Sequence, residues 1–290
     1  MFDNGLFKKF EHTKTRDGIL DLENIKDFSC YHLERGVWKM IGGEGLYYAK
    51  AVNKSRMDAE LVLSQVCKGL GFSTAIYHPF QNLVFNDPKL TEVDIINLQN
   101  YRYAVSNNVV FDDTPLAYEY YAGLGNGERQ FCSIPYSFFN SKNPIDYTKY
   151  FTKDAMRQLI KMNIFDIASY NFDRHENNYA LKIEDGKVVD VVLFDYGASG
   201  VGAKRCLEGE KYFTSFQEED LNKKNTLMAF KENSVIEEIV PFTELANELG
   251  SVDFAETSRD IKEELGYKVN FQYIDKLTQS FDETAEFLMK

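Results

Sequence analysis

The sequence predicts an α+β fold in which a β-rich first part precedes a mostly helical second part. Short apolar runs separated by glycines dominate the chain up to about residue 110, as expected of strands. Residues 151–171 carry apolar side chains at helical spacing, and the last ninety residues alternate charged and apolar positions in the same way. We therefore place a boundary near residues 106–112 and divide the chain into residues 1–110 and 111–290.

Composition narrows the class of protein. The 290 residues are 44% hydrophobic and 14% aromatic, which suits a folded protein with a sizeable core. The net charge of −12 argues against a nucleic-acid binder, which needs a basic face. The chain shows neither an apolar membrane span, nor an N-terminal signal peptide, nor a Cys-x-x-Cys pair. We expect a cytoplasmic protein in a reducing compartment; secretion without a signal peptide stays open.

The first part is expected to form one sheet and one helix. Residues 37–52, VWKMIGGEGLYYAKAV, read as two strands around a turn that contains Gly42, Gly43 and Gly45. Residues 74–85 and 101–111 are expected to add strands to the same sheet. Residues 55–72 predict a helix capped by Ser55 and ended by Gly69 or Gly71. Its expected buried stripe consists of Ala59, Val62, Leu63, Val66 and Leu70.

The second part is expected to contain one hairpin among helices. Thr152 is a fitting N-cap for the helix over residues 151–171. Its buried stripe is expected to consist of Met156, Leu159, Ile160, Ile164, Ile167 and Ala168. Asp185-Gly186 lies between two apolar runs and predicts a tight hairpin turn. Residues 223–233, KKNTLMAFKEN, are expected to form a solvated helix face.

Acidic and amide side chains flank the predicted hairpin. Asp173 and Asn178 in NFDRHENN (171–178) precede its first strand, and Asp195 in FDYG (194–197) follows its second. A hairpin brings these ends together, and clustered carboxylates repel one another unless a cation lies between them. Magnesium prefers oxygen ligands, so Asn178 and Asp195 suit a magnesium site. Asp173 would then orient the proton of an attacking hydroxyl.

Each of these residues alone has a simpler explanation. Asp and Asn are common in turns, where they cap backbone groups. Only the joint arrangement favours a functional site. Arg174 and His175 are expected to brace the loop, although Arg174 could also contact phosphate.

Lys50 lies within an apolar strand pattern directly after the glycine turn. A lysine is costly to bury without a partner, and Glu60 in the following helix can supply the opposite charge. Such a lysine–glutamate pair fixes the phosphates of ATP in protein kinases. The alternative is a plain hairpin turn, a surface lysine and an exposed glutamate.

The motif NFDRHENN…LFDYGASG resembles that of the HipA-like serine/threonine kinases, most closely their short CtkA-like members. The resemblance covers roughly residues 45–200. It implies a protein-kinase-like bilobal fold, with a β-rich N-lobe over residues 1–110 and a mostly helical C-lobe over residues 111–290. It also implies binding of ATP and Mg²⁺.

The resemblance implies a role for each candidate residue by its position in the motif. Asp173 would be the catalytic base, Asn178 and Asp195 the metal ligands, Lys50 the phosphate-binding lysine and Glu60 its partner. The nucleotide would also contact Gly42, Gly43 and Gly45 in the glycine turn, and Ala104, Val105 and Ser106 in the hinge. The order Asp173-Arg174-His175 differs from the His-Arg-Asp of ordinary protein kinases.

The expected activity is ATP- and Mg²⁺-dependent transfer of the γ-phosphate to a Ser or Thr hydroxyl of a protein substrate. Autophosphorylation and a regulatory or inhibitor protein partner are left open. The alternatives are a small-molecule or lipid kinase, a nucleotidyl transferase, an ATP-binding pseudokinase regulator and a plain divalent-metal hydrolase. The presence of Lys50, Asp173, Asn178 and Asp195 ranks catalysis above the pseudokinase. Neither a membrane nor a nucleic acid is an expected partner.

Overall fold

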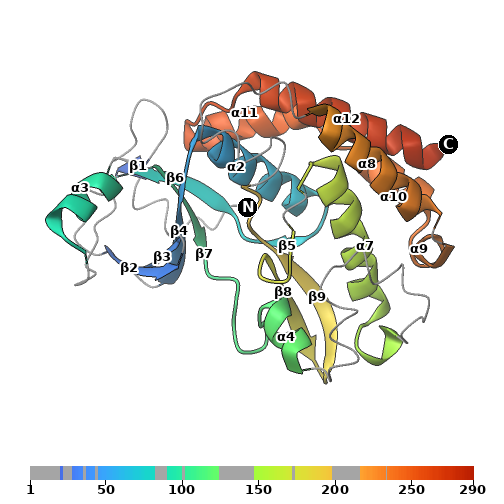
Figure 1. Ribbon diagram of the computed structural model, residues 1–290, viewed down its shortest axis with the longest axis horizontal. Helices are drawn as coiled ribbons and strands as arrows, with labels where there is room; N and C mark the ends of the chain where they lie inside the picture. Colours follow the sequence, from blue (N-terminus) through green and yellow to red (C-terminus); the bar gives the residue numbers. More distant parts are fainter. Residues whose placement is uncertain are drawn as a thin grey trace. The chain divides into compact units, whose positions relative to one another are not determined.

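The computed structural model shows a mixed α+β protein, which confirms the α+β part of the fold prediction (Figure 1). It describes residues 20–21, 28–34, 37–42, 45–81, 90–99, 102–123, 147–171, 174–197, 216–232 and 234–290. The chain divides into two compact units. The first contains Met1–Gln65, Ala75–Asn108 and Phe254–Ile274, and the second contains Val66–Thr74, Val109–Asp253 and Asp275–Lys290. No sequence pattern indicated that a C-terminal segment would join the first unit.

A six-stranded sheet, in the order β1-β6-β7-β4-β3-β2, forms the centre of the first unit. Its neighbouring strands are antiparallel, except that β1 runs parallel to β6. The strands are β1 (Leu20–Asp21), β2 (Phe28–Glu34), β3 (Val37–Gly42), β4 (Gly45–Val52), β6 (Tyr77–Gln81) and β7 (Arg102–Asn107). The sequence predicted the last four of these strands and their common sheet, and both predictions are confirmed.

The glycine turn joins β3 to β4. The predicted order of strand, turn and strand is present, but Gly42 and Gly45 lie in the strands themselves, where they form the last pair of the β3–β4 ladder. Gly43 lies outside the described residues. Strand β4 carries Lys50 and lies between β3 and β7, so Lys50 is opposite both Val37 and Ala104.

Helix α2 (Lys54–Gly69) follows β4 after a single residue. The cap expected at Ser55 is wrong. The helix begins one residue earlier, and the Asn53 side chain accepts a hydrogen bond from the Arg56 amide at 2.9 Å, as a good N-cap does. At the other end Gly71 has φ 82°. Its amide and that of Phe72 donate to the carbonyls of Lys68 and Cys67, a Schellman motif.

The buried stripe predicted for α2 is largely confirmed. Ala59, Val62, Leu63 and Val66 are buried, whereas Leu70 is half-buried because it lies in the terminal turn. The first unit also contains α3 (Glu92–Gln99), which the sequence did not predict, and α11 (Phe254–Leu265). Helix α12 (Phe271–Met289) begins in the first unit and continues into the second.

The second unit contains the sheet β5-β9-β8. Strands β8 (Tyr179–Glu184) and β9 (Lys187–Leu193) form the predicted hairpin, and β5 (Ser73–Thr74) runs parallel to β9. The turn residues Asp185 and Gly186 both have positive φ, 50° and 76°. Two successive positive φ angles are typical of the type I′ turn that Asp-Gly favours.

Helices α7 and α4 pack against this small sheet, and further helices of the second unit pack against α7. The Thr152 hydroxyl caps α7 (Lys153–Ala168) by accepting from the Ala155 amide at 3.3 Å, and the whole predicted stripe of α7 is buried. The other elements are α4 (Ala117–Gly123), η1 (Tyr147–Lys149), α8 (Phe216–Lys231), α9 (Ser234–Ile239) and α10 (Phe242–Gly250). The predicted C-terminal helices are thus confirmed. Within the described ranges, no helix is long and apolar enough to cross a membrane.

The solvated face expected over residues 223–233 is wrong at Lys223. This lysine is 5% exposed, and its Nζ donates to the Ser280 carbonyl at 3.0 Å and to the Ser280 hydroxyl. The ammonium also lies 4.8 Å from the centre of the Tyr170 ring. A lysine can be buried where its charge finds such partners, and the charge pattern alone did not reveal them.

Candidate functional site

Lys50 on β4 forms an ion pair with Glu60 on α2. The Nζ and Oε1 atoms are 3.5 Å apart, and the side chains are 21% and 0% exposed. Because α2 starts directly after β4, its second turn lies within reach of the strand it follows. An exposed glutamate, the simpler alternative, is thus excluded, and the ion pair expected from the sequence is present.

The proposed hinge residues Ala104, Val105 and Ser106 are buried in β7. Strand β7 pairs with β4 on one side and β6 on the other, and the pairing with β6 begins at Ser106. In an antiparallel ladder the amide and carbonyl of each residue face one neighbouring strand. The backbone of these three residues is therefore committed to the sheet. Residues 107–110 lie beyond the ladder with β6.

Asn178 and Asp195 lie at the same end of the β8–β9 hairpin. Tyr179 pairs with Leu193, so Asn178 directly precedes this pair and Asp195 follows it by two residues. Asn178 is 6% exposed. Asp195 has φ 58°, a conformation that most residues other than glycine, asparagine and aspartate avoid. Such strain at a loop position is common in functional sites.

Arg174 ties the two ends of the hairpin together. Its guanidinium donates to the Asn178 carbonyl at 2.7 Å and to the Phe194 carbonyl. It also donates to both carboxylate oxygens of Asp166 on α7, at 3.0 Å each. The residues that adjoin the predicted metal ligands are thereby fixed to one another and to α7.

The charge of Arg174 is stable in this buried position. Burial alone would lower the pKa of Arg174, but the Asp166 carboxylate outweighs this effect and moves the pKa further above its usual value. The guanidinium therefore keeps its charge in the folded protein. Its two hydrogen bonds to Asp166 have the geometry of the strongest arginine–carboxylate pairs.

Asp173 lies outside the described residues, but residues on either side of it are fixed. Asn171 donates its side-chain amide to Asp166 at 2.9 Å and its backbone amide to the Asp166 carbonyl at 2.8 Å. Arg174 binds the same carboxylate. His175 braces the following turn, as expected, because its Nδ1 accepts from the Asn177 amide at 3.2 Å.

Sequence reasoning missed Asp166. The residue is 6% exposed and lies among the apolar side chains of α7. An acidic residue on an otherwise apolar helix face, eight positions before an arginine, was the available signal. Through its hydrogen bonds Asp166 holds Asn171 and Arg174 in place.

Tyr196, the central residue of Asp-Tyr-Gly, is fully buried. Its hydroxyl lies 2.6 Å from the Thr74 hydroxyl, which donates to the Leu193 carbonyl at 3.0 Å. Since Thr74 has one proton to give, Tyr196 is the donor to Thr74. Burial raises the pKa of Tyr196 well above its usual value, so the hydroxyl keeps its proton. Arg174 lies over the Tyr196 ring at 5.3 Å, so both neighbours of Asp195 are held.

The donor chemistry of the hairpin end suits a hard cation. Asn178 and Asp195 offer oxygen atoms and no sulfur or imidazole nitrogen, which favours magnesium over zinc. Within the part of the chain that the structure describes, no group of three or more His, Cys, Asp or Glu residues could hold a metal ion. Magnesium commonly takes few protein ligands and completes its shell with phosphate and water.

Comparison with known proteins gives structural similarity only. No protein-family model matches the sequence, and no curated protein matches it. The chain is similar to the Helicobacter pylori proinflammatory kinase CtkA, with 10% identity, a TM-score of 0.44, and coverage of 92% of this chain and 94% of that one. It is also similar to HipA of Shewanella oneidensis MR-1, from a toxin–antitoxin complex with HipB and operator DNA. Here the identity is 10%, the TM-score 0.46, and the coverage 91% of this chain and 66% of that one. These are the two kinds of protein that the sequence motif resembles.

Proposed function

We propose that the protein is an ATP- and magnesium-dependent kinase that transfers the γ-phosphate to a serine or threonine hydroxyl of a protein substrate. The observation that carries the proposal is the ion pair between Lys50 and the fully buried Glu60. Burying a carboxylate beside an ammonium seldom adds stability, because both charges lose water. A role in binding phosphate gives this pair a purpose.

In this proposal the first unit binds the nucleotide. The Lys50 ammonium contacts the α- and β-phosphates, and Glu60 holds the ammonium in place. The turn between Gly42 and Gly45 brings backbone amides to the phosphates. Adenine meets the backbone at residues 108–110 and not at Ala104 to Ser106, because the strand pairing of β7 continues to Asn107.

The second unit supplies the reacting end. Asn178 and Asp195 would hold magnesium, which when bound neutralises charge on the phosphates. Asp173 accepts a hydrogen bond from the acceptor hydroxyl and orients it for in-line attack on the γ-phosphate. Arg174 keeps Asn178 and Asp195 at the same place by binding the carbonyls of Asn178 and Phe194.

The choice of a protein serine or threonine as acceptor follows the motif resemblance. The same resemblance supports the two-lobed kinase arrangement and leaves autophosphorylation open. The proposed cytoplasmic location follows from the cysteine usage. Regulation by an inhibitor or other protein partner is left open in the same way.

The direct test is intact-mass spectrometry after incubation with ATP and magnesium, with a basic protein as trial acceptor. Wild type should add phosphate to itself or to the acceptor. Lys50→Met, Asp173→Asn and Asp195→Asn should each reduce the rate by about a hundredfold or more, as loss of a charge-stabilising group does. Glu244→Gln, on helix α10, is the matched control and should leave the rate unchanged.

Other products would replace the proposal. Added nucleotide mass in place of phosphate would identify a nucleotidyl transferase. No added mass, with an ATP-induced rise in melting temperature, would indicate a protein that binds ATP without transferring phosphate to these acceptors. The absence of both a mass change and an ATP-induced thermal shift would contradict the proposal altogether.

A further inference from the structure

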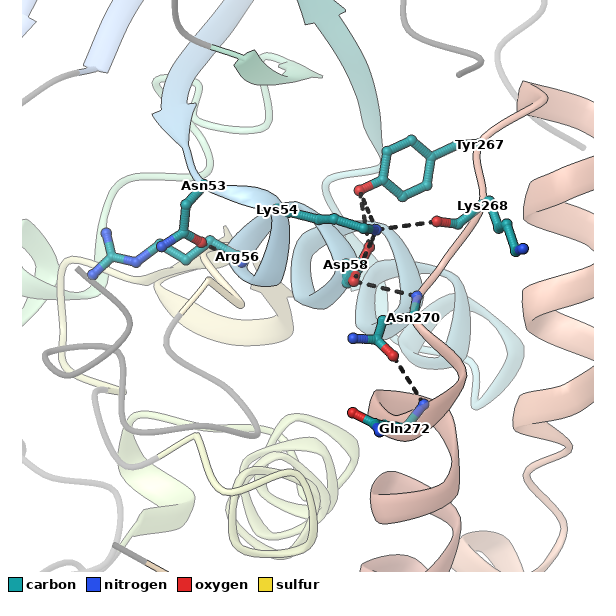
Figure 2. Close-up of polar contacts among 8 residues, drawn as sticks. All are labelled: Asn53, Lys54, Arg56, Asp58, Tyr267, Lys268, Asn270 and Gln272. Carbon is teal, nitrogen blue, oxygen red and sulfur yellow. Dashed lines mark hydrogen bonds and ion pairs between the residues drawn. The ribbon is translucent and has the colours of Figure 1, made fainter. Parts of the chain in front are cut away.

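A second buried carboxylate on α2 lies two residues before Glu60. Asp58 is 2% exposed, and its carboxylate accepts hydrogen bonds from three different residues (Figure 2). Lys54 donates from the preceding turn of α2 at 3.2 Å. The Tyr267 hydroxyl donates at 2.9 Å and the Asn270 amide at 3.3 Å. Two of the donors thus come from residues 266–270, which join α11 to α12 and lie more than 200 positions further along the chain.

Lys54 strengthens the same connection. Its Nζ donates to the Lys268 carbonyl at 3.1 Å and lies 5.0 Å from the centre of the Tyr267 ring. The first turns of α2 are therefore bound to residues 266–270 by side-chain and backbone groups together. All of these residues belong to the first unit.

Helix geometry relates this contact to the ion pair. Successive residues of an α-helix are rotated by about 100°, so Asp58 and Glu60 leave α2 in nearly opposite directions. Residues 266–270 bind α2 through Asp58, and Lys50 binds the same helix through Glu60. Any rotation or shift of α2 at Asp58 would move Glu60 as well.

Tyr273, at the start of α12, is influenced electrostatically by both carboxylates. Burial raises the pKa of Tyr273 well above its usual value, and the nearby charges of Asp58 and then Glu60 add to the effect. Tyr273 is 6% exposed and lies in the first turn of α12, directly after residues 266–270.

Stability alone gives a weak reason for the Asp58 cluster. Burial raises the pKa of Asp58 in spite of the donors around it, so the folded protein holds this carboxylate at a cost. Buried charge pairs of this kind seldom add net stability, and in some proteins they fix one arrangement among several.

We propose that residues 266–270 are a clamp that holds α2 in the position where Glu60 meets Lys50, with Asp58 and Tyr267 as its positioning residues. The value of this clamp for phosphate transfer rests on the proposed function. The clamp itself is a property of the first unit and can be tested without ATP.

The test measures how fast the Lys50 amine reacts with an acylating reagent. An ammonium held by a carboxylate keeps its proton and reacts slowly with an acylating reagent. Limited acetylation of the full chain with an N-hydroxysuccinimide ester, followed by peptide mass spectrometry, gives the rate at Lys50. The rate at Lys290, whose side chain is 77% exposed, serves as the internal standard.

In Glu60→Gln, Lys50 has lost its partner, and its acetylation rate should exceed the wild-type rate by roughly threefold or more. Asp58→Ala should raise the rate in the same direction, and Tyr267→Phe, which removes a single hydroxyl and is expected to fold, should raise it less. Asp58→Ala added to Glu60→Gln should give no further increase. Glu244→Gln breaks the half-buried Arg157–Glu244 ion pair of the second unit and should leave the rate unchanged.

A Lys50 rate that stays at the wild-type value in Asp58→Ala and Tyr267→Phe, while Glu60→Gln raises it, would overturn the clamp. So would a rate that Glu60→Gln fails to raise, because the ion pair would then be absent. The predicted pattern in a protein that transfers no phosphate would support the clamp and refute only the proposed function.

Discussion

Arg174 shows how much of the site depends on one side chain. It binds the Asp166 carboxylate and two backbone carbonyls at the hairpin end, and the two charged side chains are 5% and 9% exposed. A lysine could supply the charge but not the planar fork of donors.

We therefore expect Arg174→Met to lower the free energy of unfolding by about 3 to 5 kcal/mol, because Asp166 is left buried without its cation. Urea denaturation measures the change. Lys182→Met is the matched control: its ion pair with Glu184 is exposed, and its loss should leave stability unchanged within error. If both variants lost the same free energy of unfolding, burial of the Arg174–Asp166 pair would make no difference to its contribution.

The pKa of Asp58 predicts a pH dependence with a definite sign. Burial raises it above 3.8, so the folded chain holds this proton more tightly than the unfolded chain. The stability contributed by Asp58 therefore falls as pH rises through this raised pKa. Asn does not titrate, so the free energy of unfolding of wild type minus that of Asp58→Asn should fall as the pH rises above 3.8, the ordinary pKa of the side chain. A difference that increases with pH in urea denaturation would contradict the buried placement of Asp58.

At the scale of elements, Asn53 and Ser55 at the start of α2 are expected to contribute differently to stability, because only Asn53 caps the helix. Asn53→Ala should cost about 1 kcal/mol, because the Arg56 amide loses its acceptor. Ser55→Ala lies inside the helix and should cost clearly less, since alanine is the better helix former there. Thermal denaturation of the two variants checks the assignment, and a larger loss in Ser55→Ala would restore Ser55 as the cap.

The β8–β9 turn allows a similar paired comparison. A Cβ at Gly186 would meet nothing within 4 Å, so the cost of Gly186→Ala is the backbone cost of φ 76°. We expect a loss of about 1 kcal/mol. Gly69, at the end of α2, is equally open and has no such φ, so Gly69→Ala should stabilise by roughly half a kcal/mol. Melting temperatures that move in the same direction in both variants would be inconsistent with the turn conformation.

Local patterns in the sequence were sufficient for most elements. Asp185-Gly186 specifies its own hairpin turn, and the apolar spacing of α7 specifies its buried face, because both signals lie within a few residues. Ser55 was mistaken for a cap because Ser and Asn bind the first amides of a helix almost equally well. The exact helix start depends on where β4 ends, which the residue pattern does not define.

Contacts between distant residues could not be predicted in the same way. The Lys50–Glu60 pair was accessible because a strand and the helix that follows it are adjacent in the chain. Lys223 with Ser280, and Asp58 with Tyr267, join positions that only the folded chain brings together. A single sequence carries no sign of such pairings, so Lys223 was assigned to the surface.

At the scale of the whole molecule, the C-terminal segment is divided between the two compact units. Phe254–Ile274 belongs to the first unit and Asp275–Lys290 to the second, although α12 runs through the division. The clamp gives the first part of this segment a role in the nucleotide-binding half of the proposal. The units are therefore not successive stretches of the chain.

The central claim is that this chain binds ATP with magnesium through Lys50 and Asp195. Calorimetric titration of ATP, with and without magnesium, into wild type, Lys50→Met and Asp195→Asn tests it most directly. Asn tolerates the φ of 58° at this position, so Asp195→Asn should fold. We predict that magnesium strengthens ATP binding in wild type, that Asp195→Asn removes this gain, and that Lys50→Met weakens binding with or without magnesium. An unchanged magnesium gain in Asp195→Asn, or no ATP binding by wild type, would contradict the account.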